Sequence, residues 1–273
     1  MTLNKIYTVC FSPTATSRKV SEAIARGVAL GAVPIARNNL TRHAAALQLA
    51  PTDLAVFAVP VYGGHVPPIA LERFAEVKGQ QTPAIIVVVY GNRAFEHAAE
   101  ELDAFVRRQG FVPVAAAAFV GEHSYSTELT PIGLARPDRA DLEEASQFGR
   151  KVFAKIATDQ LSAVDVAGLK DQMPPMDRLK AFVGAITASK QAYTGTMLPI
   201  TDPELCTLCG TCSALCPVEA IRPGDELHTD PARCIRCCAC VKACPDGART
   251  LPNPYAVPLS TYFAERKPPI MVL

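Results

Sequence analysis

Short apolar runs alternate with amphipathic stretches along the first 158 residues of the chain. The runs have the length and β-branched content of strands, and some are apolar throughout, as in strands buried on both faces. Between them, apolar residues recur every three or four positions, which predicts covering helices. The predicted strands are 5–11, 34–40, 54–59, 84–90 and 112–120, and helices are predicted after residue 17 and over 69–77, 94–109 and 137–158. The alternation predicts a doubly wound α/β domain, which binds ligands at the carboxyl ends of its parallel strands.

The loop after the first predicted strand is rich in hydroxyl groups. It reads Ser12-Pro13-Thr14-Ala15-Thr16-Ser17 and leads directly into a helix. A helix N-terminus offers unpaired N–H groups and a partial positive charge, and the hydroxyls add donors, so the loop suits a phosphate. The same residue types form ordinary helix caps, but the place of the loop after the first strand favours the phosphate site.

Nine of the ten cysteines lie after residue 205, and eight of them fall into two copies of one spacing. Each copy, at 206–216 and 234–244, follows C-x2-C-x2-C-x3-C before a proline, which resembles the [4Fe–4S]-binding run of bacterial-type ferredoxins. The resemblance implies two clusters, with the fourth cysteine of each copy bound to the other cluster. One ligand set is then Cys206, Cys209, Cys212 and Cys244, and the other is Cys234, Cys237, Cys240 and Cys216. Zinc and a disulfide framework are the alternatives.

A second resemblance covers residues 5–155, which look like a flavodoxin, and the whole chain resembles fusions of a flavodoxin-like domain to a two-cluster ferredoxin. It implies a five-stranded parallel sheet of order 2-1-3-4-5, a small α+β ferredoxin domain, and flavin mononucleotide (FMN) as a further cofactor. The phosphate of FMN would lie on the hydroxyl-rich loop. That loop keeps every hydroxyl position of the flavodoxin pattern but carries Ala15 in place of glycine, which is strained if the position needs a positive φ.

The resemblance places the flavin ring between the loops after the third and fourth strands. Tyr62 and Tyr90 are the candidate stacking rings, because the chain has no tryptophan, and the alternative is that both are ordinary aromatic anchors of their loops. Backbone amides around the neighbouring small residues would face the edge of the ring. The cofactor-binding candidates are Ser12, Thr14, Ala15, Thr16, Ser17, Val61, Tyr62, Gly63, Gly64, Tyr90, Gly91, Asn92 and Arg93.

Several side chains near these loops have a second interpretation. Arg93 pairs either with the flavin or a substrate, or with Glu96 on the following helix. His123, Asp53 and a serine would suggest a hydrolytic triad, but no G-x-S-x-G elbow is present. The loop at 121–126 is better interpreted as one that shields the flavin or meets the ferredoxin domain. The two cysteines outside the ligand sets, Cys10 and Cys238, are interpreted as packing residues.

Composition excludes several classes of function. The formal net charge is +1 and no dense Lys/Arg tract is present, so nothing indicates a nucleic-acid partner. No apolar run approaches the roughly 18–20 residues of a membrane span, and the N-terminus does not resemble a signal peptide. Because the cysteines are expected to be reduced metal ligands, we expect a cytoplasmic protein.

These patterns together divide the chain into four segments. We expect a flavodoxin-like FMN domain at 1–158, a linker with a docking helix at 159–197, a two-cluster ferredoxin domain at 198–251, and an extended proline-rich tail at 252–273. The docking helix is expected at 177–189.

The combination of cofactors indicates electron transfer. We expect a relay of single electrons between two [4Fe–4S] clusters and FMN, with a redox protein or a small molecule as the outside donor or acceptor. The alternatives are an FMN-dependent reductase that is fed by the clusters, and a binding or sensing protein whose flavodoxin-like domain is empty. No side chain stands out as an acid, base or nucleophile, so enzymatic activity is left open.

Overall fold

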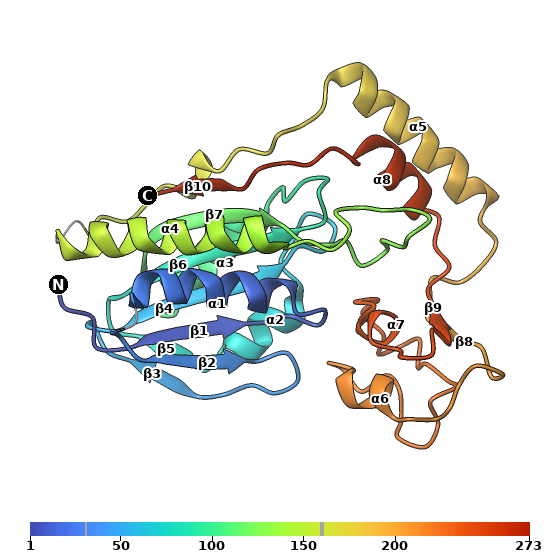
Figure 1. Ribbon diagram of the computed structural model, residues 1–273, viewed down its shortest axis with the longest axis horizontal. Coiled ribbons are helices and arrows are strands. Elements are labelled where there is room, and N and C mark those ends of the chain that lie inside the picture. The colour runs from blue at the N-terminus through green and yellow to red at the C-terminus, as the bar shows by residue number, and fades with distance from the viewer. Residues whose placement is uncertain (31, 159–160) are drawn as a thin grey trace. The chain divides into compact units, whose positions relative to one another are not determined.

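The computed structural model describes residues 1–30, 32–158 and 161–273. They form two compact units, each described here by itself (Figure 1). The sheet unit comprises Met1–Glu122, Ala135–Met173 and Arg266–Leu273, and the cysteine unit comprises His123–Leu134 and Pro174–Glu265. The four segment boundaries expected from the sequence stay predictions, and the start of the expected linker, at 159–160, lies outside the described residues.

Five parallel strands form the body of the sheet unit, in the predicted order 2-1-3-4-5. In the order in which they lie, they are β2 (Ile35–Asn39), β1 (Ile6–Cys10), β4 (Leu54–Pro60), β6 (Thr82–Tyr90) and β7 (Phe111–Val120). Every residue of β6 is buried, as its unbroken apolar sequence predicts for a strand that helices cover on both faces. The predicted doubly wound α/β fold with flavodoxin-like strand order is confirmed.

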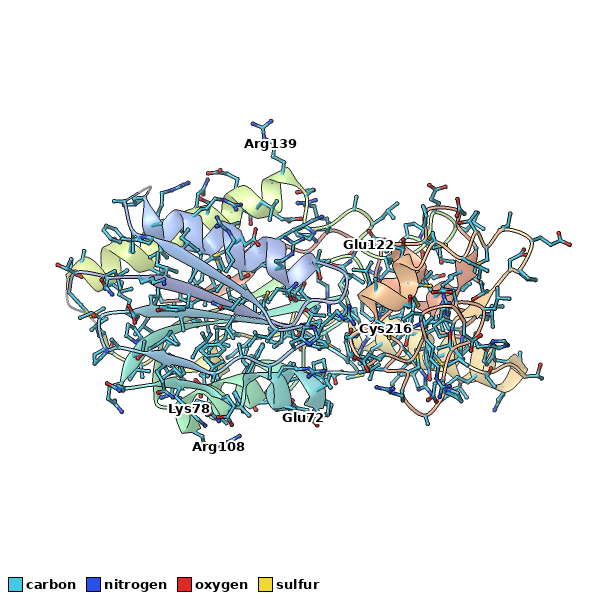
Figure 2. All side chains as sticks on the ribbon, turned by 90° about the horizontal axis from the view of Figure 1, so that it is seen from below. Glu72, Lys78, Arg108, Glu122, Arg139 and Cys216 are labelled. Atoms are coloured by element: carbon cyan, nitrogen blue, oxygen red, sulfur yellow. The ribbon has the colours of Figure 1, made fainter. Side chains whose placement is uncertain are left out.

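The helices of the sheet unit cover the sheet with their apolar stripes. They are α1 (Thr16–Ala29), α2 (Pro68–Phe74), α3 (Ala98–Arg108) and α4 (Arg139–Ala157), with a short 3-10 turn, η1 (Val166–Gly168). α1 and α4 pack side by side on one face (Figure 1). The residues that were predicted to face inward are buried. They are Val20, Ile24 and Val28 in α1, and Ala98, Leu102, Phe105 and Val106 in α3. Arg139, at the start of α4, points away from the sheet (Figure 2).

The C-terminal tail differs from the extended segment that we expected. It contains a helix, α8 (Ala256–Tyr262), and a strand, β10 (Ile270–Val272), which pairs antiparallel with the edge of β7. The helix begins where the Asn253 side chain accepts hydrogen bonds from the N–H groups of Tyr255 and Ala256. The strand forms because the unpaired edge of β7 offers backbone partners that a short apolar segment satisfies. A further small parallel pair, β3 (Leu47–Leu49) with β5 (Val77–Gly79), was also not predicted.

Apart from the 17-residue helix α5 (Met176–Ala192), the cysteine unit is built from short elements. They are β8 (Ile200–Thr201), α6 (Thr211–Leu215), α7 (Ala239–Lys242), β9 (Arg249–Thr250) and α8. Its apolar core joins Ile132, Phe182, Leu259 and Phe263. The loop after β7 therefore packs within this unit, and the Lys242 ammonium donates to the Ser126 carbonyl at 2.6 Å. Across the described ranges, none of the helices is long and apolar enough to cross a membrane.

The crossing of α1 and α4 yields a test of this packing. A Cβ added at Gly149 would lie 2.2 Å from the Ile24 carbonyl oxygen, so Gly149→Ala should lower the free energy of unfolding by about 1–3 kcal/mol. The matched control is Gly184→Ala in α5, where a new Cβ meets nothing within 4 Å. That change should raise stability by about 0.5–1 kcal/mol, because alanine favours helix. Urea unfolding measures both, and an equal effect of the two substitutions would contradict the proposed close contact.

Candidate functional site

The eight motif cysteines line two cavities of the cysteine unit. The first cavity, about 300 Å³ including the part open to solvent, is lined by Cys206, Cys209, Cys212 and Cys244. The second, about 310 Å³ by the same measure, is lined by Cys216, Cys234, Cys237, Cys240 and the extra Cys238. In each cavity three of the motif cysteines come from one copy and the fourth comes from the other, and the second cavity also contains Cys238. These are the two ligand sets that the ferredoxin resemblance implies, so the residues present fit two [4Fe–4S] clusters.

The chemical state of the cysteines bears on the two alternatives. All ten cysteines of the chain are described and all are free, so the structure does not contain the disulfide framework. Within the described ranges, no group of three or more His, Cys, Asp or Glu side chains is arranged to hold a single metal ion. Cys216 lies among the loops after α6 (Figure 2), and its sulfur accepts a hydrogen bond from the Ala220 N–H at 3.1 Å. Such a bond stabilises a thiolate ligand.

The two copies of the motif fold alike. Cys206 N–H donates to the Asp202 carbonyl and Cys234 N–H donates to the Asp230 carbonyl, both at 3.1 Å. The halves also exchange bonds, because Asp202 N–H donates to the Ala248 carbonyl at 2.8 Å and Asp230 N–H donates to the Ala220 carbonyl at 2.7 Å. Positive φ values recur at matching positions, namely Leu208 with Arg236, Gly210 with Cys238, and Glu219 with Gly247. The cysteine unit therefore has an internal two-fold relation that extends to its hydrogen bonds.

Burial governs the electrostatics of the second cavity. It raises the pKa of the Cys237 thiol to about 12 and that of Cys240 to about 11, although the Arg249 guanidinium opposes the rise at Cys240. In the first cavity, burial likewise raises the pKa of the Cys212 thiol, and the Arg249 guanidinium again opposes this rise. Thiols of this kind ionise when they bind a metal, so cluster binding must displace their protons.

The loop after β1 has a positive φ at Ala15, the position where the flavodoxin pattern has glycine. Ala15 adopts φ 65° and ψ 0° as the residue before α1, so the substituted glycine position does need a positive φ. The Ser12 hydroxyl accepts the Arg18 N–H at 3.0 Å, which holds the loop against the first turn of the helix. Ser17 is fully buried, and its hydroxyl has no partner among the described residues. Together with the first N–H groups of α1, this hydroxyl fits a phosphate.

The loops at the carboxyl ends of the strands are joined by backbone hydrogen bonds. Val61 N–H donates to the Val89 carbonyl and Gly121 N–H donates to the Tyr90 carbonyl, each at 2.9 Å. The glycines of the second loop, Gly63 and Gly64, form a tight turn with positive φ at both. Across from this turn, the Gly64 carbonyl accepts the His97 N–H at 3.0 Å. The candidate loops therefore converge at the switch point of the sheet, where this topology places ligands.

Two of the predicted side-chain roles fare differently in the structure. Tyr62 is partly exposed and keeps its candidate role, but Tyr90 is only 2% exposed and its ring packs edge-on against Phe95. Tyr90 is therefore not available for stacking in this conformation; burial also raises the pKa of its hydroxyl. Arg93 pairs with Glu96 at 2.6 Å, which is the second of its two predicted partners.

Two further polar residues, Asp53 and His65, make local contacts in the structure. Asp53 stands at the amino end of β4, where its carboxylate accepts the Ala50 N–H at 2.9 Å, so it lies away from the ligand loops and forms no hydrolytic triad. His65 stacks on His97 with ring centroids 5.4 Å apart, and its Nδ1 lies 2.5 Å from a Glu101 carboxylate oxygen.

Sequence reasoning missed one residue that shapes a candidate loop and one that reaches a cysteine ligand. Asp171 accepts the N–H groups of Phe95 and Glu96 and so holds the loop after β6, but it lies in a stretch without periodic pattern. Arg249 reaches the Cys212 sulfur at 3.7 Å. Aligning the two copies would have singled it out, because the matching residue in the first copy is the apolar Ile221.

The strained alanine before α1 can be tested directly. A non-glycine residue in the left-handed region carries roughly 1–2 kcal/mol of strain, so Ala15→Gly should raise the free energy of unfolding by about 1 kcal/mol. The control is Ala154→Gly in the exposed face of α4, which should lower it by about 1 kcal/mol. Thermal or urea unfolding of the two variants decides, and destabilisation by both changes would show that Ala15 is not strained.

Comparisons with known proteins bear on both units. A family model described as a 4Fe-4S dicluster domain matches residues 198–245, and a comparison with curated proteins finds no match. Three similar solved structures are flavodoxins: one from the domain Archaea (15% identity, 56% of this chain and 99% of that one, TM-score 0.40), one from Bacillus cereus (15%, 56% and 98%, 0.39) and one from Streptococcus pneumoniae TIGR4 (16%, 55% and 98%, 0.39). The fold assignment rests on strand order and direction. The chain thus joins a domain of flavodoxin-like topology to a ferredoxin-type 4Fe–4S dicluster domain.

Proposed function

We propose that the chain is an electron-transfer protein that binds two [4Fe–4S] clusters and FMN and passes single electrons between them. The observation that carries this proposal is the pair of cysteine-lined cavities, each completed by a cysteine from the opposite copy of the motif. The first cavity would hold one cluster through the Cys206 set, and the second would hold the other through the Cys216 set. The family match to a dicluster domain supports the same conclusion.

The two cysteine sets lie next to one another within the cysteine unit. Cys212 of the first set and Cys240 of the second belong to one buried cluster with Ile221. The crossed fourth ligands also connect the two cavities through the chain. Cys212, in α6, lines the first cavity, and Cys216, directly after α6, lines the second. Adjacent clusters suit electron exchange between them.

The sheet unit contributes a site whose donors fit FMN. The buried Ser17 hydroxyl and the first N–H groups of α1 would hold its phosphate, while Tyr62 and the amides of the Gly63–Gly64 turn would hold the ring. A Cβ built on Gly63 meets nothing within 4 Å, so there is open space beside this residue, whereas Gly64 lies against the Glu96 side chain. When bound, FMN supplies a centre that accepts one or two electrons. The protein residues bind, orient and shield the group.

The outside electron donor or acceptor is proposed to be a redox protein or a small molecule. Free cysteines and iron–sulfur ligation suit a reducing compartment, and we propose the cytoplasm on that ground.

Anaerobic purification followed by iron, sulfide and flavin quantitation tests the proposal. We expect about eight irons, eight sulfides and one FMN per chain, because two cubanes and one flavin are proposed. Zinc in place of iron, or four irons or fewer in protein reconstituted with excess iron and sulfide, would contradict the two-cluster assignment. A chain that is fully loaded with iron but binds no FMN at saturating concentration would contradict the flavin assignment.

A further inference from the structure

Arg249 is a buried cation beside the first cavity. Its side chain is 2% exposed, and the residue lies in β9, which the pairing with Thr201 of β8 holds in register. One terminal nitrogen, Nη1, lies 3.7 Å from the Cys212 sulfur and donates to the Glu226 carbonyl at 2.6 Å. The other terminal nitrogen donates to the Thr229 hydroxyl. Backbone and side-chain contacts thus fix the guanidinium at the wall of the first cavity.

The internal two-fold relation shows that this cation is present on one side alone. Arg249 follows Cys244-Pro245 at the same distance in sequence as Ile221 follows Cys216-Pro217. Ile221 is also 2% exposed and lines the second cavity, as Arg249 lines the first. Two equivalent positions therefore place an apolar side chain in the wall of the second cavity and a positive charge in the wall of the first. The charge also reaches the second set, because Arg249 opposes the rise in the pKa of Cys240, but the guanidinium lies in the lining of the first cavity, 3.7 Å from the Cys212 sulfur.

A fixed positive charge favours the reduced form of a neighbouring cluster. Reduction adds one negative charge to the cluster, and in a poorly solvated interior the attraction between this charge and a guanidinium is only weakly screened. The two oxygen atoms to which Arg249 donates, the Glu226 carbonyl and the Thr229 hydroxyl, carry no charge that would neutralise it. The Glu226 carboxylate also lines the first cavity, where it accepts the Ser213 hydroxyl at 3.1 Å and the Gly224 N–H at 3.0 Å. Its negative charge acts in the opposite direction.

We propose that the positive charge of Arg249 raises the reduction potential of the cluster in the first cavity relative to that of the cluster in the second. The proposal rests on the two-cluster part of the proposed function. One buried side chain would thus account for a difference in reduction potential between two clusters with equivalent cysteine ligands. Arg249 and Glu226 would shift the potential of the first cluster in opposite directions.

The test is an anaerobic redox titration of the iron-loaded full chain, followed by electron paramagnetic resonance. Arg249→Met removes the charge and should lower the reduced-to-oxidised ratio of one of the two redox steps about tenfold or more at fixed potential, which is about 59 mV for one electron. The other step should move less. Arg249→Lys, which keeps the charge, should recover most of the difference. Glu226→Gln should shift the same step in the opposite direction.

The matched control is Arg222→Met, which removes the same charge from an exposed position next to Ile221. Solvent and salt screen a charge of this kind, so both steps should stay in place. Equal shifts of both steps in Arg249→Met, or no shift beyond that of Arg222→Met, would overturn the proposal. It would also be overturned if Arg249→Lys shifted the step as far as Arg249→Met.

If Arg249→Met loads poorly, Arg249→Gln serves as the second neutral variant. A loss of iron from both neutral variants, with full loading of Arg249→Lys, would assign Arg249 to cluster binding and overturn the tuning role. Wild-type protein with fewer than eight irons or a single redox step would count against the proposed function itself. Wild-type protein with two steps, neither of which depends on Arg249, would count against this inference alone.

Discussion

The exchange of one cysteine between the two copies of the motif is the constraint on which the cysteine unit depends. Neither cavity has four motif cysteines from its own copy, so under the crossed assignment both copies must fold together before either ligand set is complete. The exchanged backbone hydrogen bonds, from Asp202 to Ala248 and from Asp230 to Ala220, impose the same dependence on the backbone. In a unit with short helices and strands, this mutual completion supplies the order that a large apolar core supplies elsewhere.

The sheet unit is stabilised differently, because a large apolar core holds loops that contain residues with positive φ. Its central strands are fully buried, and the loops at their carboxyl ends carry positive φ at Ala15, Gly63, Gly64 and Asn92. Such conformations persist where the surrounding structure enforces them, and they gather at ligand sites. The core thus holds in place the loops for which FMN binding is proposed.

How far the sequence predicted the structure depended on whether the signal was local. The unbroken apolar run of β6 and the regular cysteine spacing are signals contained in short stretches of sequence. The buried strand and the ferredoxin-type dicluster domain were both predicted correctly from them. β10 could not be predicted, because three apolar residues form a strand only beside the open edge of β7. The burial of the Tyr90 ring against Phe95 was not anticipated either, and its stacking role stays a prediction. Asp171 gave no signal, since its loop contacts are to distant backbone groups.

The crossed assignment of cysteines is tested most directly by counting irons in two double variants of the full chain. Cys212→Ala with Cys244→Ala removes two ligands that line the same cavity, so the second cluster should remain, with about four irons per chain. Cys212→Ala with Cys216→Ala removes one ligand from each cavity, so both clusters should be lost. The opposite result, with about four irons in the second variant and none in the first, would contradict the crossed sets.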